Sequence, residues 1–306
     1  MIIVVGSLNM DLVIQSDRIP RPGETVLGNG FKQIPGGKGA SQADTVAKLG
    51  GKVVMIGEVG EDSFGKALRE NLKKDGVDVS GIYKKIEEPT GVAAIIVEKS
   101  GNNAITVASG ANFLLTVDDI EKQEELLNKG KILLIQLETP LETVLYSLKK
   151  GKELGMKTIL NPAPGRELSE EIFICTDIIT PNETELELLT GMPAETMDDI
   201  EKAANQLLHQ GLEDVIVTLG SNGALHVNKQ GVKHFSGHKV KAIDTTAAGD
   251  CFNGALALGL LEKKSMEESI EFAMAAAALS VTKEGAQISL PHRDDVEKFM
   301  SGGEKI

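Results

Sequence analysis

Apolar runs of strand length alternate with segments of helical period along most of the chain. The runs predict strands at Ile2–Val5, Val53–Ile56, Ile132–Leu137, Thr158–Leu160, Asp177–Thr180 and Val215–Leu219. They are apolar on both faces, which is typical of strands buried in a parallel sheet between helices. The pattern therefore predicts β-α-β units and an α/β fold with three layers, α/β/α, around a mainly parallel central sheet.

Two segments, residues 11–36 and 88–108, interrupt this rhythm. They are rich in Pro and Gly and carry alternating apolar residues such as Val92, Ile95 and Val97, a pattern that indicates short antiparallel strands. A sheet this small must pack on the body or pair with another chain. We expect one domain, residues 1–306, with a small β-sheet lid, although two unrelated surface hairpins remain an alternative.

Two helix starts are marked by capping sequences. Thr139-Pro140-Leu141-Glu142 predicts a Thr cap with Pro at the first helical position and Glu at the third, and Ser265-Met266-Glu267-Glu268 predicts a second capping box. Both indicate structure rather than chemistry.

Composition narrows the classes of partner. The 306 residues carry 45 acidic and 32 basic side chains, a formal charge of −13, which argues against nucleic acid because a phosphate backbone requires a basic face. An anionic ligand would need positive charge concentrated locally. The two cysteines have no metal-ligand or disulfide spacing, and no apolar run is long enough to span a membrane. We expect a cytoplasmic protein that binds no membrane.

The segment Asp244-Thr245-Thr246-Ala247-Ala248-Gly249-Asp250 leads into an apolar helical stretch. Free backbone N–H groups and the positive end of the helix dipole make such a turn an anion site. Asp250 could accept the proton of an attacking hydroxyl there, or it could be an ordinary helix cap.

A second glycine cluster, Gly36-Gly37-Lys38-Gly39-Ala40-Ser41, also precedes a helical stretch. It is not a P-loop, because Gly39 stands where that motif requires Ser or Thr, and Gly6-Ser7-Leu8-Asn9 is not a dinucleotide fingerprint. Lys38 could supply local positive charge to a ligand, or it could be a solvated surface lysine.

Further polar clusters follow predicted strands, at the edge where open parallel sheets bind ligands. Asn9 and Asp11 suit vicinal hydroxyls, Glu138 lies on the same edge, and a carboxylate such as Glu185 can hold water on Mg²⁺. Asn182 precedes Glu185, and the glycines of Thr218-Leu219-Gly220-Ser221-Asn222-Gly223 leave backbone open to a nucleotide.

Taken together, these motifs resemble the ribokinase-like (PfkB) family of carbohydrate kinases over nearly the whole chain. The most specific matches are the Asp244–Asp250 segment and the Gly36–Gly39 cluster. Others are Pro22-Gly23-Glu24-Thr25, Gly91-Val92-Ala93, Gln136-Leu137-Glu138, Asn161-Pro162-Ala163-Pro164, Thr180-Pro181-Asn182-Glu183-Thr184-Glu185 and Gly285-Ala286-Gln287.

The resemblance implies ATP-dependent phosphorylation of the 5-hydroxyl of D-ribose, with Asp250 as general base and the amides around Ala247, Ala248 and Gly249 as anion hole. It implies sugar-binding residues Asn9, Met10, Asp11, Gly37, Lys38, Gly39, Ala40, Ser41, Glu138 and Asp250. ATP would contact Asn182, the segment Thr218 to Gly223, Gly249 and Asp250, with adenine near Met274, and Glu185 would act on Mg²⁺ through water.

The family also implies a monovalent cation, K⁺, near Asp244, Thr246, Ser280, Lys283, Gly285 and Ser289, and a homodimer formed through the lids. One position departs from the family pattern: Ser41 stands where Asn is expected to bind the sugar. A lost hydrogen-bonding partner discriminates strongly between substrates, so deoxyribose or a related sugar is an alternative. A nucleoside kinase of this family and a sugar-binding regulatory protein without turnover are further alternatives.

Overall fold

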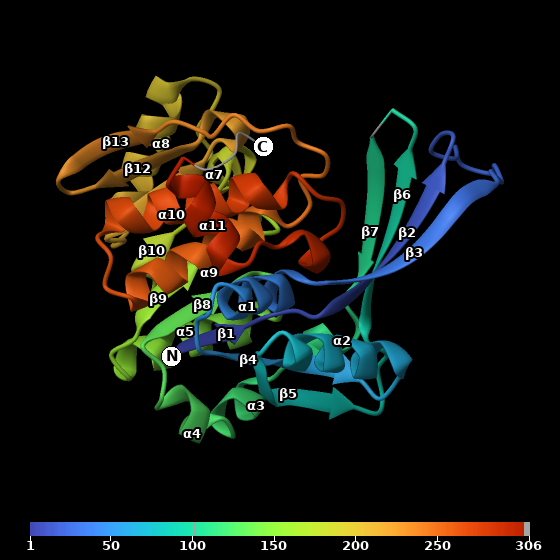
Figure 1. Cartoon of the computed structure of the whole chain (residues 1–306). Helices are drawn as coiled ribbons and strands as arrows, with labels where there is room; N and C mark the ends of the chain where they lie inside the picture. The colour runs from blue at the N-terminus through green and yellow to red at the C-terminus, as the bar shows by residue number, and fades with distance from the viewer. Residues whose placement is uncertain (101, 303–306) are drawn as a thin grey trace.

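The central element is a nine-stranded sheet. The computed structural model describes residues 1–100 and 102–302, and Gly101, within the second predicted lid segment, lies outside them. The strand order is β13-β12-β11-β10-β9-β8-β1-β4-β5 (Figure 1). The strands are β1 (Ile2–Val5), β4 (Val53–Gly60), β5 (Asp78–Lys85), β8 (Ile132–Ile135), β9 (Lys157–Leu160), β10 (Ile178–Ile179), β11 (Asp214–Thr218), β12 (Ala224–Asn228) and β13 (Gly231–Phe235).

All neighbouring pairs from β5 to β11 run parallel, and only β12 and β13 are antiparallel additions at one edge. The six predicted strands are confirmed, with ends that differ by up to four residues. The sequence pattern missed β5, most of whose residues are exposed or half-buried, and the hairpin β12–β13.

Helices cover both faces of the sheet, so the three-layer prediction is confirmed. One apolar core joins the sheet to α1 (Lys38–Lys48), α2 (Ser63–Lys74), α9 (Ala248–Leu261), α10 (Met266–Ser280) and α11 (Arg293–Met300). The core on the opposite face includes α3 (Val117–Glu121), α4 (Glu124–Leu127), α5 (Leu141–Glu153), α6 (Glu170–Ile174), α7 (Glu183–Thr190) and α8 (Met197–Leu208). Alternate residues of β1 enter the two cores, as buried strands require.

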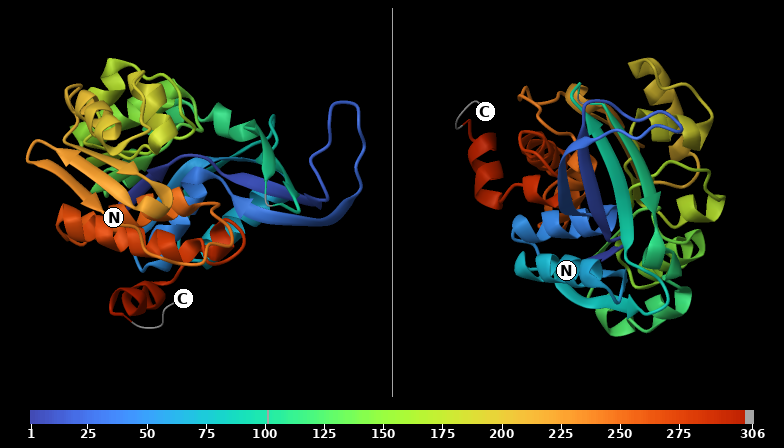
Figure 2. Two further views of the ribbon diagram at one scale, coloured as in Figure 1. Left: turned by 90° about the horizontal axis from the view of Figure 1, so that it is seen from above. Right: turned by 90° about the vertical axis from the view of Figure 1, so that its right-hand side faces the viewer.

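The two interrupting segments form one sheet, as expected. Its order is β3 (Gly28–Gly36), β2 (Asn9–Ser16), β6 (Gly91–Glu98) and β7 (Asn103–Ala108). The prediction of antiparallel strands holds for the outer pairs, whereas the inner pair β2–β6 is parallel. The sheet projects from one side of the body (Figure 2).

One of the two predicted helix starts is wrong. Ser265 and Glu268 form the expected reciprocal capping box of α10, but α5 begins at Leu141 with Pro140 as its cap and no side-chain cap bond. Pro140 has an extended ψ of 134°, so it lies outside the helix and moves the start one residue beyond the position at which Thr139 could cap it. No helix in the described part of the chain combines the length and apolarity needed to cross a membrane.

Candidate active site

Asp250 lies in the first turn of α9, as the sequence predicted. The helix begins at Ala248 and its cap residue Ala247 adopts a left-handed conformation with φ 62°. Asp250 is therefore the third helical residue and not the cap, and its Oδ1 accepts a hydrogen bond of 3.0 Å from Gln42 Nε2. The turn presents amides of the helix N-terminus beside a carboxylate.

The glycine cluster forms the start of α1. Gly37 has φ 89°, and a Cβ there would lie 2.6 Å from the Asn9 amide nitrogen, so glycine is required for the close approach of this turn to β2. Lys38 is the first residue of α1 and is half-buried. Half-buried at a helix start, Lys38 is not freely solvated, and its role toward a ligand stays a prediction.

Four carboxylates surround Lys38 at longer range. Burial would lower the pKa of Lys38, but the negative charges of Asp250, Glu138, Glu185 and Asp11 raise it above its usual value. No ion pair within 4.0 Å involves Lys38 in the described residues. The lysine is charged and held apart from its counter-ions.

The carboxyl groups of Asp11 and Asp250 are affected by burial and by the charges around them. Burial, followed by the charges of Glu138 and Asp250, raises the pKa of Asp11 to about 7. Burial also raises the pKa of Asp250 to about 6, against the lowering effects of Lys38 and of the Gln42 hydrogen bond. The structure thus brings together Asp11, Lys38, Glu138 and Asp250 from β2, α1, the β8–α5 connection and α9.

Two residues that the sequence did not single out hold predicted site residues in place. Asn112, which is 1% exposed, donates a hydrogen bond of 2.8 Å to Asn9 Oδ1 and also pairs with the backbone of Leu8. Ser7 Oγ donates to Glu138 Oε2 at 2.5 Å. Ser41 is buried in α1. Such tertiary partners have no signature in local sequence.

Asn182 and Glu185 are engaged in capping α7. Asn182 Oδ1 accepts from the Glu185 amide at 2.8 Å, and Glu185 Oε2 accepts from the Asn182 amide at 3.0 Å. The side-chain Nδ2 of Asn182 and the Oε1 of Glu185 remain for a ligand. Burial raises the pKa of Glu185, and the charge of Lys38 opposes that shift.

The segment from Thr218 to Gly223 leaves β11 as a tight turn. Gly220, Ser221 and Asn222 form a single exposed 3-10 turn. Gly223 has φ 99°, and a Cβ there would lie 1.9 Å from the Phe235 carbonyl oxygen. The backbone is therefore open on one side and pressed against β13 on the other.

Asp244 joins the two segments of the predicted cation site. Its Oδ1 accepts from the amide and hydroxyl of Thr246, and its Oδ2 accepts from the Gly285 amide at 2.9 Å. Burial would raise the pKa of Asp244, but these hydrogen bonds lower it. Ser280 is buried at the end of α10, Ser289 is buried in the η3 turn (Gln287–Ser289), and Lys283 is exposed.

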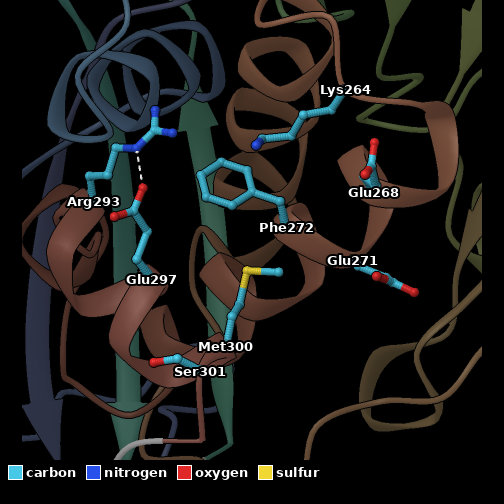
Figure 3. A pocket seen from close by; sticks show the side chains of 8 residues that line it. All are labelled: Lys264, Glu268, Glu271, Phe272, Arg293, Glu297, Met300 and Ser301. Atoms are coloured by element: carbon cyan, nitrogen blue, oxygen red, sulfur yellow. Dashed lines mark hydrogen bonds and ion pairs between the residues drawn. The ribbon is translucent and has the colours of Figure 1, made fainter.

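Met274 lies in α10 and lines a hollow of about 400 Å³ with Phe235, Ser236 and His238. A second hollow of about 390 Å³ lies between α10 and α11, where Arg293 pairs with Glu297 beside Phe272 (Figure 3). None of the predicted site residues lines this second hollow.

The fold and the arrangement of these residues indicate the class of protein. A helix N-terminus, a half-buried lysine and a nearby carboxylate at the carboxyl edge of a parallel sheet are the parts of a phosphotransferase that activates a hydroxyl. Residues 1–293 match the profile described as pfkB family carbohydrate kinase. The chain belongs to the pfkB family of carbohydrate kinases.

Named relatives are sugar kinases. The ribokinase of Haemophilus influenzae is 44% identical over 297 residues, 97% of each chain. The deoxyribokinase of Salmonella typhi is 39% identical over 301 residues, 98% of each chain. The structure of Arabidopsis thaliana ribokinase complexed with ribose and ATP superimposes with a TM-score of 0.91 at 35% identity, covering 98% of each chain.

Proposed function

We propose that this chain transfers the γ-phosphoryl group of ATP to the 5-hydroxyl of D-ribose, giving D-ribose 5-phosphate. The observation that carries the proposal is the position of Asp250. Its carboxylate lies in the first turn of α9, where the charges of Lys38 and Glu138 act on it. Its own charge acts in turn on Asp11 and Lys38. The similarity to ribokinases supports the choice of ribose.

The residues take the following parts in the proposal. Asp250 accepts the hydroxyl proton, and the amides of Ala247 to Gly249 stabilise the charge that develops on the transferred group. Asn9, Asp11 and Glu138 hydrogen-bond the sugar hydroxyls, and Met10, Gly37, Gly39, Ala40 and Ser41 complete the sugar site. Lys38 supplies the local positive charge that a chain of −13 requires.

We propose that ATP contacts Asn182 and the 218–223 turn with its phosphates and its ribose. The adenine would lie near Met274. No group of three or more His, Cys, Asp or Glu side chains in the described residues could hold a metal ion alone. This fits Mg²⁺ that is carried by the nucleotide phosphates, with Glu185 holding one of its waters.

A monovalent cation fits the Asp244 segment. A carboxylate and neighbouring backbone carbonyls are hard oxygen donors of the kind that alkali cations prefer, and Asp244 already ties residues 244–246 to Gly285. When bound, K⁺ would add positive charge beside the first turn of α9. We expect turnover to be higher in potassium buffer than in a buffer containing only Tris, and equal rates would contradict the cation assignment.

The lid is proposed to pair two copies of the chain. Its exposed apolar side chains Ile14, Phe31, Ile105 and Val107 are 41%, 59%, 55% and 46% exposed, and a small sheet with such residues is stabilised by pairing. A dimer in light scattering that becomes a monomer on Phe31→Glu would support this.

The cytoplasmic location remains a prediction of the sequence.

The experiment that tests the function is a coupled ADP-release assay with ribose, deoxyribose, fructose and adenosine. A preference for ribose is expected. Deoxyribose is the second candidate, because Ser41 replaces a longer hydrogen-bonding side chain and a deoxyribokinase is 39% identical. A preference for adenosine would favour a nucleoside kinase, and sugar binding without ADP release would favour a regulatory protein.

A further inference from the structure

A row of buried polar side chains lies beneath the first turn of α9. Gln136 follows β8, Asn161 follows β9 and Thr180 follows β10, so each strand end contributes one residue, and Gln42 of α1 joins them. Their exposed fractions are 1%, 6%, 1% and 0%. None of the site residues predicted from the sequence is among these four.

The hydrogen bonds of this row are fixed in one direction. The Thr180 carbonyl can only accept, so Asn161 presents Nδ2 to it at 3.3 Å and turns Oδ1 toward Gln42. Gln42 Nε2 then donates to Asn161 Oδ1 at 3.2 Å and to Asp250 Oδ1 at 3.0 Å. Gln42 Oε1 accepts from Gln136 Nε2 at 2.6 Å.

The opposite orientation of the Gln42 amide would be unfavourable. Its oxygen would then face the oxygens of Asn161 and Asp250, and its NH₂ group would face the Gln136 donor. Both Nε2 hydrogens and Oε1 are used, so Gln42 has one orientation. Since it is fully buried, breaking any of these bonds would leave an unpaired polar atom.

The same strand end also holds the backbone of α9. Thr180 Oγ1 donates to Asn253 Oδ1 at 2.7 Å, and Asn253 Nδ2 donates to the Gly249 carbonyl at 2.8 Å. Both the side chain of Asp250 and the turn that carries it are therefore tied to the ends of β8, β9 and β10.

We propose that Gln42 is a positioning residue that occupies Asp250 Oδ1 and leaves Oδ2 as the oxygen that takes the proton from the substrate hydroxyl. This rests on the proposed role of Asp250 as base. In the step, the O–H bond of the sugar breaks and its proton goes to Oδ2. The sugar oxygen forms a bond to the γ-phosphorus, and the bond from that phosphorus to the bridging oxygen breaks, with its electron pair leaving on ADP.

The Gln42 hydrogen bond stabilises the ionised form of Asp250, so its removal shifts the pH dependence as well as the rate. It is among the influences that hold the pKa of Asp250 down to about 6 against burial. Without it, more of the enzyme carries a protonated base at neutral pH, and the carboxylate rotates more freely.

The test compares Gln42→Leu, Gln42→Glu and a matched control, Gln123→Leu, which removes a buried glutamine between α3 and α4. We expect Gln42→Leu to lower kcat about 10- to 100-fold with the sugar KM within about threefold, because orientation acts on the transition state. In the pH profile of kcat, the midpoint of the acid limb should move to a higher pH than in the wild type. Gln42→Glu places a second carboxyl beside Asp250 and should move it further.

Gln136→Leu supplies an independent variant if Gln42→Leu fails to fold, because it leaves Gln42 in place but frees its amide. We expect a smaller loss of kcat and a smaller upward shift of the same midpoint. Gln123→Leu should keep the wild-type kcat and midpoint.

The two possible failures are distinguishable. Wild-type kcat and midpoint in folded Gln42→Leu, alongside an inactive Asp250→Asn, would overturn the role of Gln42 alone. Wild-type turnover in Asp250→Asn would overturn the base assignment itself.

Discussion

Two groups of charged side chains at the carboxyl edge of the same sheet are arranged in opposite ways. In the first, Glu58 of β4, Lys85 of β5 and Asp119 of α3 are in contact: Lys85 Nζ lies 2.9 Å from Glu58 and 3.1 Å from Asp119. In the second, Lys38 is half-buried as Lys85 is, yet none of its four neighbouring carboxylates pairs with it within 4.0 Å.

The difference separates structural charges from charges available to a ligand. Paired groups recover part of their desolvation cost from each other, whereas the unpaired charges of the proposed site would recover it from a bound ligand. A perturbed pKa accompanies both arrangements, so it is the spacing of opposite charges that marks the site.

The largest effect is expected from one substitution made in both groups. Asp250→Asn should lower kcat roughly 10²- to 10⁴-fold, the usual contribution of a general base. Asp119→Asn should leave kcat within about twofold and destabilise the fold by roughly 1–3 kcal/mol, because it removes hydrogen bonds to Lys85, Lys122 and the Thr116 cap. Steady-state kinetics and urea unfolding measure the two effects, and equal kcat losses would remove the distinction.

A second pair of variants tests the lysines. Lys38→Met should lower kcat/KM about 10²-fold, as expected for loss of a preorganised charge, with little loss of stability. Lys85→Met should leave turnover nearly unchanged and lower the urea midpoint, since buried Glu58 loses its partner. If Lys38→Met were instead the less stable variant with normal kcat/KM, its charge would be structural.

The smallest effect concerns stability against pH. Asp250 has its pKa raised to about 6, above its value in the unfolded chain, so it opposes folding at higher pH and this cost disappears as the pH falls from about 6 toward 4. Asp250→Asn should therefore be more stable than wild type by roughly 2–3 kcal/mol at pH 8, with no gain near pH 4.

The contribution of Asp119 to stability depends on pH in the opposite direction. Burial opposes ionisation, but its hydrogen bonds lower its pKa, so its contribution is present at neutral pH and is lost as the pH falls below about 4. Urea unfolding of wild type, Asp250→Asn and Asp119→Asn from about pH 2 to 8 measures both. Comparing variants is necessary because burial raises the pKa of Glu58 to about 7 as well.

The sequence predicted the elements whose signals are local. The continuous apolar runs of β1, β4 and β8 and the Ser265 to Glu268 box needed no tertiary information. The half-exposed strand β5 and the cap of α5 depend on packing and were missed or misplaced. The hairpin β12–β13 was also missed, although β12 is a mostly buried run.

The same division applies to the site. Glycine clusters and helix starts located Lys38 and Asp250, because they act through backbone conformation. Gln42 holds Asp250, Gln136 holds Gln42, and Asn112 holds Leu8 and Asn9. The partners in these bonds lie about 90 to 210 positions apart. A single sequence carries no record of such pairings.

The position of β1 has a consequence for folding. Its residues pair on one side with β4 and on the other with β8, so that Ile2 lies between Val53 and Ile132, and its side chains enter both cores. Neither core can form completely until these distant segments meet. Such non-local pairing gives a high contact order, and high contact order goes with slow folding. The four residues of β1 thus join both helical layers into one cooperative unit, and a weakened β1 would loosen both faces of the body together.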